Sequence, residues 1–98
     1  MVYTLEIKIE AIADMQDAYD YYEENKKGLG GRFLDTVENH FDRIQLYPEH
    51  YQIKRKPYRE AVVKDFPYVI IFEIIENSII VYAVFNTYLD PSKKPKTL

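Results

Sequence analysis

Basic side chains gather in one stretch of this sequence, between positions 54 and 64. The group consists of Lys54, Arg55, Lys56, Arg59 and Lys64, and it is interleaved or flanked by Tyr51, Tyr58 and Tyr68. Cations beside aromatic rings can bind phosphate and stack nucleobases, so the group could bind RNA. The same cations could bind an acidic protein segment. The simpler interpretation is a set of charged residues that keeps a sheet edge from aggregating.

The sequence holds few other groups for chemistry. It contains no cysteine, which excludes a disulfide framework, a thiol nucleophile and a zinc–thiolate site. It has no phosphate-binding glycine loop, no nucleophile elbow and no cluster of metal ligands, so we expect neither a cofactor nor a metal. His40 and His50 fall in or just after a helical pattern, away from the expected sheet. We therefore expect surface histidines rather than general bases.

Charge is divided unevenly along the chain. The net charge is −3, yet residues 10–50 hold ten acidic and four basic side chains, whereas residues 51–98 hold five acidic and eight basic ones. An acidic half and a basic half favour two different binding faces, although charges scattered for solubility would give the same totals.

The N-terminal segment carries Glu6 where a signal peptide would need an apolar stretch. The longest apolar runs, residues 68–72 and 79–85, are too short to cross a membrane as helices. We therefore expect a cytoplasmic protein with no membrane association.

Two helical patterns follow a short strand. Residues 3–9 alternate between apolar and polar, which predicts a half-buried strand. Ala11, Met15, Ala18 and Tyr22 then form one stripe of a helix, with Asp14, Asp17 and Asp20 off that stripe. The run Gly28-Leu29-Gly30-Gly31 predicts a break, where glycine permits a left-handed cap. Leu34, Val37, Phe41 and Ile44 form the stripe of a second helix, which Pro48 ends. A short glycine loop predicts an antiparallel helical hairpin.

The second half of the sequence has the pattern of strands. We expect strands over residues 58–64, 68–75 and 79–86, because these runs are rich in β-branched and aromatic residues and are separated by Phe66-Pro67 and by Glu76-Asn77-Ser78. The predicted fold is α+β in the order β-α-α-β-β-β. It has an antiparallel twisted sheet, the helical hairpin on one face, and the other face partly open. We expect one domain over residues 1–89 and a basic C-terminal tail over residues 90–98.

Several short motifs, taken together in this order, resemble the RelE/ParE superfamily of type II toxins, also known as plasmid stabilisation proteins. They cover nearly the whole chain: Ala11-Ile12-Ala13-Asp14-Met15, Tyr19-Asp20-Tyr21-Tyr22, Gly28-Leu29-Gly30, Phe33, Pro48-Glu49-His50-Tyr51, Tyr58-Arg59-Glu60, residues 66–72, Val84-Phe85-Asn86 and Asp90-Pro91. The resemblance implies a toxin that a cognate antitoxin neutralises by folding a disordered segment across it. RelE-like members cleave messenger RNA on the ribosome, whereas ParE-like members poison DNA gyrase.

The resemblance also allows the catalytic set of the RNA-cleaving branch to be compared with this chain. Glu60 and Val62 stand where that branch has lysines, Val69 and Leu89 stand where it has arginines, and Asn86 stands where many members have histidine. Arg59, Lys64 and Tyr88 remain as catalytic candidates. The candidates for binding target or antitoxin are Lys54, Arg55, Lys56, Tyr58, Asn86, Lys93 and Lys94. This comparison favours a ParE-like inhibitor of a host target. The alternatives are a RelE-like endoribonuclease with an atypical site and a non-toxic binding module.

Overall fold

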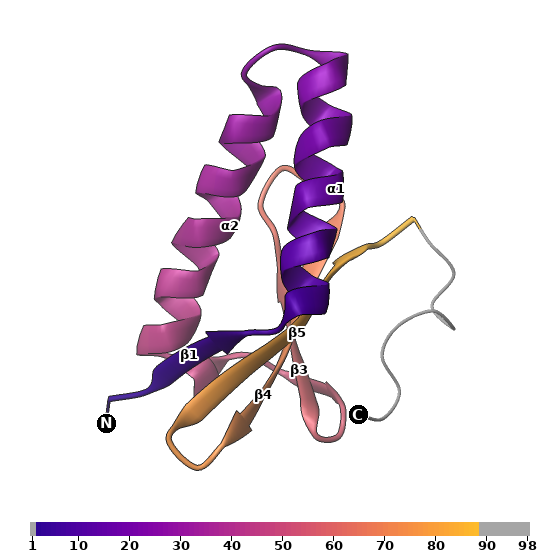
Figure 1. The fold of residues 1–98 in the computed structure, drawn as a ribbon. Helices are drawn as coiled ribbons and strands as arrows, with labels where there is room; N and C mark the ends of the chain where they lie inside the picture. Colours follow the sequence, from indigo (N-terminus) through magenta and orange to yellow (C-terminus); the bar gives the residue numbers. More distant parts are fainter. Residues whose placement is uncertain (1, 89–98) are drawn as a thin grey trace.

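Two helices pack over one face of a five-stranded sheet in this computed structural model, which describes residues 2–88 (Figure 1). The elements follow in the order β1 (Thr4–Ile7), α1 (Ile9–Asn25), α2 (Leu29–Leu46), the 3₁₀ turn η1 (Pro48–His50), β2 (Ile53–Arg55), β3 (Tyr58–Val62), β4 (Tyr68–Ile75) and β5 (Ser78–Asn86). The α+β class and the expected order are confirmed. The predicted basic tail, residues 90–98, and Leu89, Lys93 and Lys94 lie outside the described residues.

The sheet has the strand order β1-β5-β4-β3-β2 and is mixed rather than wholly antiparallel. The strands β3, β4 and β5 form the expected antiparallel meander, but β1 pairs with β5 in parallel, with Thr4 opposite Ser78 and Ile7 opposite Val81. The prediction of an antiparallel sheet is therefore wrong for this pair. A tight turn forces antiparallel pairing, whereas β1 and β5 are separated by the rest of the chain, so no turn sets their direction. The short edge strand β2 was also not predicted.

The main core lies between the helical hairpin and the sheet. Phe33, Val37 and Ile44 of α2 are fully buried against Ile70 and Phe72 of β4. Their spacing along α2 follows the helical stripe that the sequence predicts. A ring cluster extends this core, since Phe33 contacts the rings of Tyr22, Phe66 and Tyr68 at centroid distances between 5.0 and 5.5 Å. This packing fixes the helices over the sheet and positions every surface described below.

The turn between the helices uses fewer glycines than expected. Gly28 adopts the left-handed region with φ 89°, but α2 begins at Leu29, so Gly30 and Gly31 are helical rather than part of a loop. The carboxylate of Glu23 in α1 accepts the N–H groups of Gly28 at 2.9 Å and of Gly30 at 3.0 Å. One side chain of α1 thus caps the start of α2, where backbone N–H groups have no helical partner.

The sheet face opposite the helices carries a second, smaller buried cluster. Its members are Tyr58, Val69, Ile71, Ala83 and Phe85, none more than 8% exposed. In the β4–β5 ladder, Ile71 faces Ala83 and Phe72 faces Val81, so Tyr82 is an extra residue in a bulge. The centre of this face is therefore apolar and buried, in contrast to the partly open face that the sequence suggested.

Candidate functional site

Three of the predicted binding residues form an exposed group on the β2–β3 hairpin, named here the basic hairpin: Lys54, Arg55 and Lys56. The guanidinium of Arg55 lies 5.8 Å from the centre of the Tyr58 ring, which favours the cation over the ring face. Tyr58 is itself 6% exposed and packs edge-on against the ring of Tyr82, at 5.6 Å. The hairpin therefore presents its cations from a base of packed aromatic rings.

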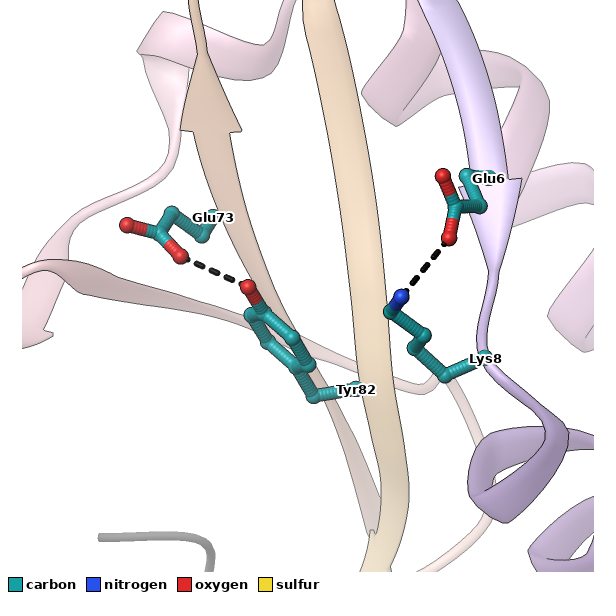
Figure 2. A network of polar contacts seen from close by, with 4 residues as sticks. All are labelled: Glu6, Lys8, Glu73 and Tyr82. Carbon is teal, nitrogen blue, oxygen red and sulfur yellow. Dashed lines mark hydrogen bonds and ion pairs between the residues drawn. The ribbon is translucent and has the colours of Figure 1, made fainter. Parts of the chain in front are cut away.

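A hydrogen bond holds Tyr82, the ring against which Tyr58 packs. The Tyr82 hydroxyl donates to Glu73 Oε1 at 2.7 Å (Figure 2). Separately, at the β1 edge of the sheet, Lys8 forms an ion pair with Glu6 at 2.9 Å (Figure 2). Burial and the bond to Glu73 raise the pKa of Tyr82 to about 12, so the phenol remains a hydrogen-bond donor at neutral pH. The bond to Glu73 fixes the tyrosine that supports Tyr58.

Arg59, a catalytic candidate, is used to hold the chain together. Its Nη1 donates to the carbonyl oxygen of Tyr51 at 2.7 Å and to that of Glu49 at 3.4 Å. Glu49 in turn accepts the hydroxyl of Tyr3, and this bond is the main reason that the pKa of Tyr3 is raised. Arg59 thus ties η1 to β3.

Lys64, the second catalytic candidate, lies at the other end of β3, against α2. Its backbone N–H donates to Nε2 of His40 at 3.1 Å, so the neutral ring must carry its proton on Nδ1. Burial and the nearby Arg43 lower the pKa of His40. His40 is therefore half-buried and bonded, which differs from the surface residue expected, whereas His50 is exposed and stacks on Tyr47.

Tyr88 and Asn86 lie where β5 ends. The Tyr88 side chain is 85% exposed, and its backbone N–H donates to Asn86 Oδ1 at 2.9 Å. Asn86 also lines a groove of about 290 Å³ between α1 and β5. The other lining residues are Asp14, Asp17, Ala18, Tyr21, Tyr68, Val84 and Phe85.

Of the groove residues that were not predicted from the sequence, Asp14 has the most specific contact. Its Oδ2 accepts the backbone N–H of Val84 at 3.0 Å, and burial raises its pKa. Asp14 lies off the apolar stripe that the sequence predicts for this helix. However, Ala11, Asp14 and Ala18 are spaced at i, i+3 and i+7, which puts the carboxylate on the buried side of α1. A carboxylate at such a position could have been recognised as a partner for a backbone donor.

The structure does not bring the catalytic candidates together. Arg59 lies near the start of β3, whereas Lys64 lies beyond its end, in the turn before β4. The strand from Arg59 to Val62 alone spans about 10 Å. Tyr88 lies beyond the end of β5, whose last residue Asn86 pairs with Tyr68, at the far end of the sheet from the basic hairpin. The candidates thus divide between the two ends of the sheet.

The described residues carry neither a metal-binding cluster nor a membrane-spanning helix. Within residues 2–88, no group of three or more histidine, aspartate or glutamate side chains is arranged to hold a metal ion. Over the same residues, neither helix is long and apolar enough to span a bilayer.

Comparison with known proteins finds a matching family model and matching solved structures. Residues 5–87 match the family model described as the ParE toxin of the type II toxin–antitoxin system parDE, a span that lies within the predicted domain 1–89. The fold is similar to a chain in a solved structure of the chromosomal ParDE toxin–antitoxin system from P. aeruginosa, with a TM-score of 0.78 and 13% sequence identity. That alignment covers 87% of this chain and 96% of the other. A search of curated proteins gives no match.

Proposed function

Since this chain belongs to the ParE toxin family of type II toxin–antitoxin systems, we propose that it arrests growth by binding a host macromolecule such as DNA gyrase. A cognate antitoxin holds it inactive, and its place of action is the cytoplasm, where such a target resides. The observation that carries the choice of binding over RNA cleavage is the separation of Arg59 from Lys64 and Tyr88, which lie at the opposite end of the sheet.

Cleavage of RNA would need cations that converge on one phosphate. Each preorganised donor at a developing charge contributes about 3 kcal/mol, or roughly a hundredfold in rate. Arg59 already donates to two backbone carbonyls, so its guanidinium would have to give up these bonds to meet a substrate. Lys64 lines a hollow against α2 beyond the other end of β3, away from the carbonyls that orient Arg59. The arrangement supports recognition better than catalysis.

The basic hairpin is the surface that we assign to the target. Lys54, Arg55 and Lys56 are exposed and adjacent, and Arg55 is held over a packed tyrosine. Complementary charge accelerates encounter and selects partners, and a rigid aromatic base limits the loss of side-chain entropy on binding. The hairpin therefore suits an acidic surface on the target protein.

Charge reversal tests this assignment. Lys54→Glu with Lys56→Glu should weaken growth arrest, because two attractive contacts become repulsive. The matched control is Lys26→Glu with Lys27→Glu, which changes the same charge at the exposed turn between α1 and α2. Both pairs should be compared for affinity toward the cognate antitoxin by calorimetry. If the hairpin pair keeps its toxicity, or loses antitoxin affinity to the same extent as toxicity, the hairpin is not the target surface.

A second pair of assays separates the two activities of the superfamily. Purified protein should inhibit supercoiling by DNA gyrase in a dose-dependent manner and leave messenger RNA intact in a ribosome-containing extract. Ribosome-dependent cuts in mRNA that disappear in Arg59→Ala and Lys64→Ala would replace this proposal by an endoribonuclease. If induction of the protein in cells without the neighbouring gene causes no growth arrest, the protein is not a toxin.

A further inference from the structure

A hollow of about 380 Å³ lies between α2 and the segment that joins β3 to β4, and it is named here the Arg43–Lys64 hollow. It is lined by Thr36, Asn39, His40, Arg43, Lys64 and Asp65. Two of these side chains are cations, one is a carboxylate, one is a histidine and two are neutral hydrogen-bonding groups. The backbone N–H of Lys64 anchors the hollow to the His40 ring at 3.1 Å.

The two cations of the hollow have no partner in the described part of the chain. Neither the Arg43 guanidinium nor the Lys64 ammonium forms an ion pair or side-chain hydrogen bond there, and the ion pair that does form joins Glu6 and Lys8 elsewhere. Asp65 lines the same hollow without neutralising either cation within ion-pair distance. Two unpaired cations that share one concave surface provide a site for an anion.

We propose that the Arg43–Lys64 hollow binds a phosphate group, as a monoester or a diester. A guanidinium offers a planar fork of donors and an ammonium offers three donors, so a tetrahedral phosphate can accept from both. The Asn39 amide lines the same hollow as a third donor, whereas the Thr36 hydroxyl already donates to the Arg32 carbonyl oxygen at 2.8 Å. An extended acidic peptide would require cations spread along a line, and here they share one hollow. The negative charge of Asp65 weakens anion binding at this hollow, so removing that charge should strengthen binding.

His40 couples this site to pH. The groups that face it are Thr36, Asn39 and Arg43 from α2 and Lys64 and Asp65 from the connecting segment. When the ring is neutral, Nε2 accepts the Lys64 N–H; when it is protonated, that bond is lost and a third cation faces the hollow. Anion binding should therefore strengthen as pH falls through the pKa of His40.

The experiment is a titration of the purified protein followed by the backbone and imidazole resonances of the hollow. Sulfate is the first probe, because its charge stays constant while an imidazole changes protonation state, so any pH dependence of binding comes from the protein. Arg43→Ala and Lys64→Ala should each weaken binding at least about tenfold, since each removes a charge-assisted hydrogen bond. Asp65→Asn should tighten binding. Lys26→Ala with Lys27→Ala is the control and should leave it unchanged.

His40→Gln isolates the pH effect. A glutamine oxygen can still accept the Lys64 N–H, so this variant should keep its affinity at neutral pH and lose the gain at acidic pH. Equal losses in the Arg43, Lys64 and control variants, or an Asp65→Asn variant that binds no tighter, would overturn the proposal. Shifts confined to resonances outside the hollow would do the same.

Three further probes identify the source of the phosphate. Inorganic phosphate and a 5′-mononucleotide test a free small molecule, and a short oligothymidylate tests a nucleic-acid backbone. Binding of the oligonucleotide alone, with the same dependence on Arg43 and Lys64, would assign the site to nucleic acid. Binding of a poly-glutamate peptide with higher affinity than any phosphate probe would refute a phosphate site. The titrations measure binding alone, so their outcome does not depend on whether the protein arrests growth.

Discussion

Alanine in place of Gly30 should lower the stability of the protein, whereas alanine in place of its neighbour Gly31 should raise it. A Cβ atom at Gly30 would lie 2.7 Å from the backbone oxygen of Tyr19, 2.8 Å from Cδ2 of the same residue and 3.0 Å from Glu23 Oε1. A carbon atom normally stays about 3.3 Å or more from a carbonyl oxygen, so α1 would have to move away by about 0.6 Å. A Cβ atom at Gly31 meets nothing within 4 Å.

The magnitudes follow from packing and helix propensity. Overfilling a packed contact costs about 1–3 kcal/mol, and alanine returns up to about 1 kcal/mol over glycine in a helix. Gly30→Ala should therefore lower the free energy of unfolding by about 1–2 kcal/mol, whereas Gly31→Ala should raise it by up to about 1 kcal/mol. For a chain of this size the two variants should differ in Tm by about 10 °C.

Urea denaturation followed by circular dichroism measures both variants directly. Equal slopes of unfolding free energy against urea would show that the change lies in stability and not in compactness. If the Gly30→Ala variant is as stable as the Gly31→Ala variant, the helices do not pack as closely at Gly30 as the structure shows.

Three further outcomes follow from the polar contacts of the fold. Glu23→Ala should lower the free energy of unfolding by about 1–2 kcal/mol, since it removes the acceptor of two helix-start N–H groups, while Glu24→Ala, the control on the same helix, should have little effect in urea melts. The native pKa of His40 is lowered from 6.5, so the unfolded chain binds the proton more readily than the native chain does. The free energy of unfolding should therefore fall as pH drops below about 6.5. In urea melts across pH, His40→Gln should show a weaker dependence of this free energy on pH. Burial raises the native pKa of Asp14 above 3.8, so the contribution of this residue to stability declines as pH rises past that value. The Asp14→Asn variant can still accept the Val84 N–H, and it should gain stability relative to the native chain as pH rises toward neutrality. A stability difference that does not change with pH would contradict this.

Most of the helices and strands could be predicted from the regular spacing of apolar residues in the sequence. The stripe of α2 predicted its buried face correctly, because every fourth or third residue of an apolar helix must meet the sheet. The parallel direction of β1 could not be predicted, because a strand pattern has the same period in either direction. The bulge at Tyr82 was also hidden, since an extra residue in one strand is specified by its partner strand and not by its own sequence.

Site residues were harder to predict than elements. The sequence placed Arg59 and Lys64 on one strand, but it could not show that Arg59 would turn toward the carbonyls of η1. That direction depends on where η1 packs, which is a tertiary feature. Arg43 was not singled out at all, because a lone arginine on the polar side of a helix has no local signature. It becomes informative only when the β3–β4 connection brings Lys64 beside the same hollow.

The distribution of cations constrains the mechanism more strongly than their number does. A catalyst for phosphoryl transfer needs donors that meet at one reacting group, and a misplacement of about 1 Å can cost a hundredfold in rate. A binding protein gains from cations on separate surfaces, because each surface can meet a different partner. In this chain, Arg59 is engaged with the backbone, the basic hairpin projects from one end of β3, and Arg43 with Lys64 lie at the other end. A single substrate phosphate could reach only one of these groups, whereas an extended macromolecule could engage more than one.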